Sequence, residues 1–334
     1  MGEDPNAEPS TTAGMMKAMA KVSDGTNVIG ESVKTFSMTE GKNKKGDVYV
    51  SAGDMPGALA ALKAHVEEAR AKAKPGKKQD MWNFKTSPHA EMGKTLDDSF
   101  VAFLMWARTG SQDDDDDDVG SEGSINVSKA FRRLESYADW MEDSAEDLAS
   151  SPLTYNSVKD ALGAYCMLAT HDSKDRLVWW IDLGMIDVPK VKATPVADSL
   201  RCFVWFAHAV MYDKKAQEAG MCFCEAIGQK LGFWAMMTLV PMKLSMKLDR
   251  LTIGVLPIKM KLLLLVDPPN WMNILMKVFG VFLSKKMKQR IALAKKGELH
   301  LVTEAFGTEC IPKGFSECNG TLEGNPGIAL YIGV

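Results

Sequence analysis

Long apolar runs are missing from this 334-residue chain. No window reaches the roughly 18 consecutive apolar residues of a membrane-spanning helix, because lysines and prolines interrupt the most apolar stretch, residues 256–291. The first residues, MGEDPNAEPSTT, are polar and acidic, unlike a secretory signal, and Asn6 stands where myristoylation favours serine or threonine. We therefore expect a soluble cytoplasmic protein.

Recognisable catalytic and metal-binding motifs are also missing. The sequence contains no nucleophile elbow, glycine-rich phosphate loop or Ser/His/Asp grouping. His171, His208 and His300 are too far apart in sequence for a zinc motif. Cys222 and Cys224 alternate in one predicted strand, which favours buried free thiols over disulfides or metal ligands. The absence of these motifs argues against an enzyme, and it predicts neither a cofactor nor a metal ion.

The net charge of the chain is -3 at pH 7, so it gives no general attraction to nucleic acid or membranes, which are themselves anionic. Any basic surface must therefore be local. The strongest charge run, Asp113 to Asp118, opposes compaction and predicts a solvated loop between two helices. A Ca²⁺ site is disfavoured because alternating acidic residues and a closing glutamate are missing. A further hypothesis is that this loop screens a basic surface until an anionic membrane displaces it.

The most informative part of the chain is the stretch 256–291, which begins with a predicted strand. Apolar residues recur at period two from Leu256 to Leu264, which places them on one face. Beyond Lys261 both faces are apolar, as in a strand that is covered on both sides. The sequence Asp267-Pro268-Pro269-Asn270 ends the strand, because proline has no amide hydrogen to donate.

The helix that follows, 271–283, is apolar apart from Asn273 and Lys277. Such a helix is ordinarily just buried. The alternative is a lid, with one face over a cavity and the other able to enter a lipid interface. Cations at Lys286 and Arg290 favour the lid, because each cation near an anionic membrane adds about 1 kcal/mol of attraction.

In order and spacing, these elements resemble the CRAL-TRIO family of lipid-transfer domains, and within it the branch of alpha-tocopherol transfer protein and cellular retinaldehyde-binding protein. Residues 257–261, PIKMK, stand where that branch has PLKVR, and residues 282–291, FLSKKMKQRI, stand where it has FLTEKIKERI. Upstream, residues 56–62, 97–108 and 130–134 resemble helices of the family's N-terminal part. The likeness covers roughly residues 56 to 315.

The resemblance implies an α/β fold: a small all-helical N-terminal lobe, then a lobe with a mixed β-sheet flanked by helices and a mobile lid helix over an apolar pocket. Helices that alternate with short apolar strands independently indicate an α/β layer. We expect residues 1–54 to be disordered or weakly structured. Residues 55–150 then form the helical lobe, with an acidic loop at 111–123, and residues 151–334 form the lipid-binding domain.

The same resemblance implies two sets of site residues. The first lines the pocket between sheet and lid, unless these side chains simply pack together: Leu200, Val204, Ala207, Leu256, Ile258, Met260, Trp271, Leu275 and Phe279. The second recognises phosphoinositide head groups, for which clustered basic side chains are suited: Arg108, Arg132, Lys259, Lys261, Lys286 and Arg290.

Several positions depart from the family pattern. Trp106 replaces a basic residue, and residues 226–229 replace the motif DLEG. Gly280 stands where fungal phosphatidylinositol binders carry a lysine, which argues against phosphatidylinositol as the pocket ligand. Phe203 and Ala207 replace serines that face the ligand in the tocopherol branch, so the pocket is more apolar here.

We therefore predict a protein that binds a hydrophobic lipid and transfers it between membranes, associating reversibly and peripherally with anionic surfaces. A lipophilic ligand is its expected cargo, and nucleic acid is not an expected partner. The alternative is a scaffold of the same fold that binds a protein partner, for which the C-terminal residues 331–334 suit carboxylate capture and strand addition. An enzyme is the third possibility.

Overall fold

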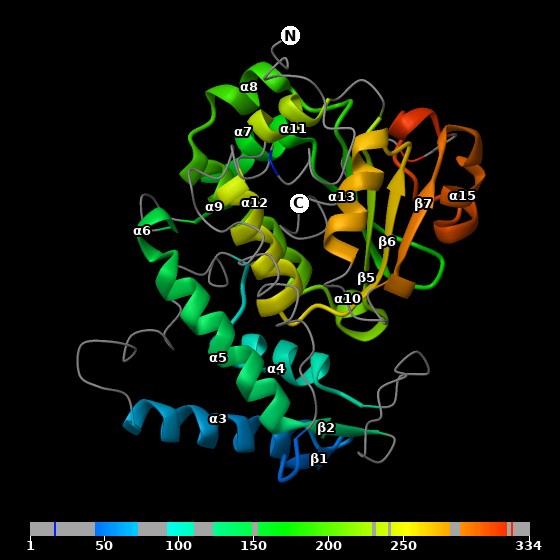
Figure 1. Ribbon diagram of the computed structural model, residues 1–334. Coiled ribbons are helices and arrows are strands. Elements are labelled where there is room, and N and C mark those ends of the chain that lie inside the picture. Colours follow the sequence, from blue (N-terminus) through cyan, green and yellow to red (C-terminus); the bar gives the residue numbers. More distant parts are fainter. Residues whose placement is uncertain are drawn as a thin grey trace.

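The computed structural model describes the following residues: 17, 44–72, 92–109, 123–148, 153–228, 232–239, 242–280, 288–318 and 322. Figure 1 shows their arrangement. The predicted acidic loop at 111–123 lies outside these residues except for Gly123, as does most of the segment 1–54. None of the helices described is long and apolar enough to cross a membrane.

In the described residues of the N-terminal lobe, four helices accompany a small two-stranded sheet. Its elements are β1 (Tyr49–Ser51), α3 (Met55–Lys72), α4 (Leu96–Trp106), β2 (Ser124–Asn126), α5 (Val127–Asp143) and α6 (Ala145–Leu148). β1 pairs antiparallel with β2, although residues 49–51 belong to the segment expected to be disordered or weakly structured. Thr95 starts α4 with a capping box shared with Asp98. The lobe is therefore mainly but not entirely helical.

A five-stranded sheet forms the centre of the second lobe, with strand order β3-β4-β5-β6-β7. Its strands are β3 (Leu168–His171), β4 (Leu177–Asp182), β5 (Met221–Ala226), β6 (Met260–Val266) and β7 (Ile291–Ala294). β3 pairs antiparallel with β4, and the other pairs are parallel. The predicted mixed sheet is thus confirmed.

Helices cover both faces of this sheet. They are α7 (Tyr155–Tyr165), α8 (Val188–Ala193), α9 (Val196–Met211), α10 (Lys214–Ala219), α11 (Phe233–Leu239), α12 (Met242–Asp249), α13 (Asn270–Gly280) and α15 (His300–Phe306). Shorter turns are the π-helical η2 (Arg250–Val255) and the 3-10 helices η3 (Lys296–Glu298) and η4 (Phe315–Glu317). In Figure 1, α15 flanks one side of the sheet, whereas α9, α12 and α13 lie on the other.

The face toward α15, hereafter the α15 face, is mostly packed. Seven of its strand residues have exposures of 0–2%, whereas Leu168, Leu262 and Ala292 are half-buried. The seven are Val178, Trp180, Cys222, Cys224, Leu264, Val266 and Ala294. They pack against Val302 and Phe306 of α15. The indole Nε1 of Trp180 donates to Thr170 Oγ1 at 2.7 Å, so the polar atom of this ring is satisfied.

All six cysteines are free thiols, as predicted. Five of them are buried, and Cys166 is half-buried. Burial raises the pKa of the Cys222 and Cys310 thiols to about 11, because the thiolate would lose its hydration. Among the described residues, no group of three or more His, Cys, Asp or Glu side chains is placed to hold a metal ion.

A β-bulge changes the prediction for the strand that starts the lid region. Met221 pairs with Met260, but Cys222 pairs with Leu262, so Lys261 is an extra residue in β6. Paired residues of parallel strands point to the same face, which leaves Met260 on the side opposite Leu262. The single apolar face predicted from Leu256 to Leu264 is therefore wrong beyond Met260. The strand itself starts at Met260 rather than at Leu256.

The two lobes are joined through α5 and the segment that leads into β6. Arg133, only 6% exposed, donates from Nε and Nη2 to the carbonyl oxygen of Leu256 at 3.2 and 2.7 Å. Its guanidinium also lies over the Trp106 ring, 4.7 Å from the centroid. Burial lowers the pKa of Arg133 to about 9. A buried cation thus fixes the N-terminal lobe against the start of β6.

Candidate functional site

The second face of the sheet, hereafter the α9 face, is the one on which the predicted pocket would lie. It carries Trp179, Ile181, Phe223, Glu225, Leu263 and Leu265, which alternate along β4, β5 and β6 with residues of the α15 face. Trp179 contacts Phe206 of α9, with ring centroids 4.5 Å apart. The α9 helix therefore packs directly on this face.

Burial on the α9 face is incomplete. Ile181, Phe223 and Leu263 are all half-buried, although they lie on the three inner strands of the sheet. Their neighbours on the α15 face, Trp180, Cys222 and Leu264, have exposures of 1%, 0% and 2%. Exposure at a sheet edge cannot explain this difference, because each pair shares one strand. At these three positions, side chains thus cover the α15 face more completely than the α9 face, although Leu262 on the α15 face is half-buried as well.

Phe203 is the residue of α9 that borders these half-buried positions, hereafter the uncovered region. Every residue from Ser199 to Met211 is buried except Phe203, which is half-buried and lies 6.3 Å from Trp179 between ring centroids. The predicted wall residues Leu200, Val204 and Ala207 have exposures of 2%, 0% and 1% and belong to the main core. The structure therefore places them in packed surroundings.

Helix α13, the described part of the predicted lid, lies on the α9 face. Trp271 and Met272 pack with Leu265 and with Phe233 of α11, and the rings of Phe233 and Trp271 are 5.7 Å apart. The side chains of the predicted pocket residues Leu275 and Phe279 lie outside the described part of the chain, as do residues 281–283. The first turn of the helix is thus anchored over β6.

The start of β6 carries the remaining predicted pocket residues. Leu256 is fully buried in the main core, Ile258 packs against the same core, and Met260 is half-buried as the first residue of the strand. Met260 pairs with Met221 and therefore lies on the α9 face. Sequence reasoning missed Ile181, Phe223 and Leu263, although the alternation of residues in β4 and β5 could have indicated them.

Four of the six predicted head-group residues lie at the starts of β6 and β7 or contact that region through the main chain, and we call these four the basic edge: Arg108, Lys259, Lys261 and Arg290. The Lys259 Nζ atom donates to the carbonyl oxygen of Arg108 at 3.2 Å, across 151 residues of sequence. The Arg290 carbonyl oxygen accepts from the amide of Leu263 at 2.7 Å. The Lys259 side chain therefore reaches the main chain of the N-terminal lobe. Lys286 and the C-terminal residues 331–334 lie outside the described residues.

Gly220 allows Lys261 to lie close to the main chain at the basic edge. A Cβ atom on Gly220 would be 2.7 Å from Lys261 Cγ and 2.8 Å from the Lys259 carbonyl oxygen. The φ angle of Gly220 is also +88°, which favours glycine. The close approach of these two segments thus depends on a residue without a side chain.

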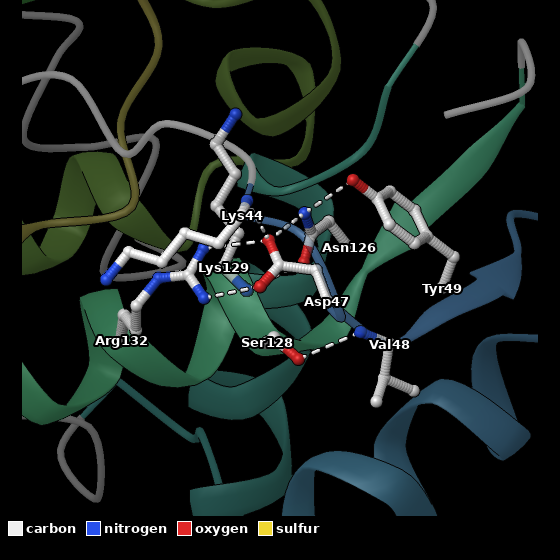
Figure 2. A network of polar contacts seen from close by, with 8 residues as sticks. All are labelled: Lys44, Asp47, Val48, Tyr49, Asn126, Ser128, Lys129 and Arg132. Carbon is white, nitrogen blue, oxygen red and sulfur yellow. Dashed lines mark hydrogen bonds and ion pairs between the residues drawn. The ribbon is translucent and has the colours of Figure 1, made fainter. Parts of the chain in front are cut away.

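Arg132, the sixth predicted residue, belongs to a separate network (Figure 2). Its Nη1 and Nη2 atoms donate to the two carboxylate oxygens of Asp47 at 2.7 and 2.9 Å. Asp47 also accepts from Asn126 Nδ2 at 2.8 Å and from the Lys44 amide at 3.0 Å. Its side chain is only 4% exposed. The geometry gives Arg132 a role in holding residues 44–51 against α5.

Replacing Asp47 with asparagine should lower the free energy of unfolding by about 2 kcal/mol at pH 7, because charge-assisted bonds to Arg132 are lost. The Arg132 guanidinium holds the pKa of Asp47 well below its ordinary value of 3.8. This carboxylate therefore stabilises the fold above about pH 4, and its contribution is lost as the pH falls further. Urea denaturation should show that wild type and Asp47→Asn converge in stability toward acid pH. A constant difference would contradict this role.

Comparisons with known proteins agree with this architecture. Residues 163–316, slightly less than half of the chain, match the model of the CRAL/TRIO domain family. This region has the mixed α/β fold of such a domain, with a five-stranded sheet flanked by helices. The match is to the CRAL/TRIO domain family as a whole, and it does not select the tocopherol and retinaldehyde branch.

One solved structure similar to this chain is the crystal structure of Sfh5. It is 12% identical, and the alignment covers 50% of this chain and 60% of that chain, with a TM-score of 0.36. The chain thus spans about three fifths of the length of this neighbour. A search of curated proteins gives no match.

Proposed function

We propose that this protein binds a hydrophobic lipid between the α9 face of the sheet and helix α13, and that it transfers this lipid between membranes. The observation that carries the proposal is the unequal burial of the two faces of the sheet. Most inner-strand residues on the α15 face are fully buried, with Leu262 half-buried, whereas Ile181, Phe223 and Leu263 on the α9 face are all half-buried.

The chemistry of the uncovered face suits a lipid. Apolar surface exposed to water costs about 25 cal/mol per Å², so three partly exposed large side chains in the middle of a sheet favour an apolar occupant. Phe203 of α9 adds a fourth half-buried apolar side chain from the opposite wall. Most of the described residues there are apolar, and Glu225 supplies a carboxyl group. A lipid would cover this surface better than water does.

The basic edge supplies the proposed contact with a membrane. In this proposal, Arg108, Lys259, Lys261 and Arg290 act together as a local positive surface on a chain whose net charge is -3. Each cation adds about 1 kcal/mol near an anionic bilayer, so together they support reversible attachment. Phosphoinositide head groups are the preferred target, because their phosphates can accept several charge-assisted hydrogen bonds. In this proposal, α13 opens when the basic edge reaches such a membrane.

Native mass spectrometry of the purified protein tests the carrier function. We expect a bound lipid as added mass, exchangeable with lipid from vesicles. The same measurement after incubation with vesicles of labelled phospholipid and sterol gives the loading from a defined source. A bare protein that takes up no lipid from these vesicles would refute the proposal and favour the scaffold alternative.

A further inference from the structure

Trp179 on β4 has a buried polar atom whose hydrogen-bonding capacity is unused. Its Nε1 atom is buried without a hydrogen-bond partner among the described residues, and the residue is only 3% exposed. Two other buried indoles do have acceptors: Trp180 Nε1 donates to Thr170 Oγ1 at 2.7 Å, and Trp140 Nε1 donates to the Lys247 carbonyl oxygen at 3.3 Å. Trp179 is therefore an exception that calls for an explanation.

The position of Trp179 relates this atom to the proposed lipid site. Its ring lies on the α9 face, stacked on Phe223 with centroids 5.4 Å apart and close to Phe206 and Phe203. Phe223 and Phe203 are the half-buried residues of this aromatic cluster. The indole thus contacts the two rings that border the uncovered region.

A phenylalanine at position 179 would pack in the same cluster without the free-energy cost of an unsatisfied N–H group. We infer that Trp179 is a recognition residue of the lipid site, and that its N–H donates to an oxygen acceptor of the bound lipid. This inference rests on the proposed lipid-binding function. An indole N–H can only donate, so the partner must be an acceptor, such as a carbonyl or hydroxyl oxygen within an otherwise apolar molecule. Pure hydrocarbons gain nothing from this contact.

The test compares two ligands that differ only in the acceptor, 5α-cholestan-3-one and 5α-cholestane, delivered from phosphatidylcholine vesicles. Wild type should bind the ketone about tenfold more tightly than the hydrocarbon, and Trp179→Phe should abolish that preference. Trp180→Phe is the matched control, because it removes an indole from the next residue on the α15 face. It should keep the preference.

Nitrogen-15 NMR of the tryptophan indoles gives a second readout that needs no variant. The Trp179 N–H resonance should move downfield when the ketone is bound and stay in place with the hydrocarbon. An unchanged preference in Trp179→Phe, or an equal loss for both ligands, would overturn the recognition role alone. If wild type binds neither these sterols nor any vesicle lipid, the proposed function itself fails.

Discussion

Replacing Leu263 with tryptophan is expected to reduce bound lipid at least tenfold while changing the free energy of unfolding by less than about 1 kcal/mol. Leu263 is half-buried on the α9 face of β6, so a larger side chain can extend into the region that the lipid would occupy. Blocking that volume removes apolar contact area from the ligand, and about 1.4 kcal/mol corresponds to a tenfold loss. Lipid per protein is measured by mass spectrometry, and stability by urea denaturation.

Leu264 provides the matched control on the same strand. It is 2% exposed and packed in the cluster beneath α15, so Leu264→Trp should overpack the core and cost about 1–3 kcal/mol or more. Lipid that stays bound to Leu263→Trp would refute a site on the α9 face. Equal destabilisation by the two variants would show that both faces are packed solid.

Changing Lys261 and Arg290 together to glutamine should weaken binding to vesicles that contain phosphoinositides by roughly 30-fold at low salt. The reason is that two cations near the surface contribute about 1 kcal/mol each, and about 2 kcal/mol corresponds to this factor. The difference should shrink as salt is added, because screening weakens both attractions. Vesicle co-sedimentation measures the binding, and native mass spectrometry should show unchanged lipid occupancy.

The control for charge is the pair Lys159→Gln and Lys192→Gln. Both lysines are exposed, and Lys192 belongs to α8, which follows the carboxyl end of β4 and thus lies at the opposite end of the sheet. This double variant should bind vesicles like wild type. If it loses as much binding as the Lys261 and Arg290 pair, attraction depends on total charge and the basic edge has no specific role.

Regular elements could be predicted well from sequence because their signals are local. Cys222 and Cys224 do alternate in one strand, β5, as their spacing indicates. The prolines at 268 and 269 separate β6 from α13, as expected. Alternation and breaker residues act over a few neighbours, and such signals survive in a single sequence.

The site was harder to predict because its geometry depends on distant partners. Nothing near Arg132 in sequence indicates its ion pair with Asp47, 85 residues away. Which of Phe203, Leu200 and Val204 borders the uncovered region depends on how α9 is rotated over the sheet. The bulge at Lys261 could not be predicted either, because a strand that is apolar on both faces shows the same sequence pattern in either register.

The bulge at Lys261 makes the number of residues in β6 more critical than their identity. Every side chain from Leu262 to Val266 owes its direction to that one inserted position. Deleting one residue there would exchange the two faces of the strand. Leu262 and Leu264 would then point to the α9 face, and Leu263 and Leu265 to the α15 face. Conservative substitutions in the same strand would keep the direction of every side chain. Residues of β6 can therefore change during evolution as long as the number of residues in the strand stays the same.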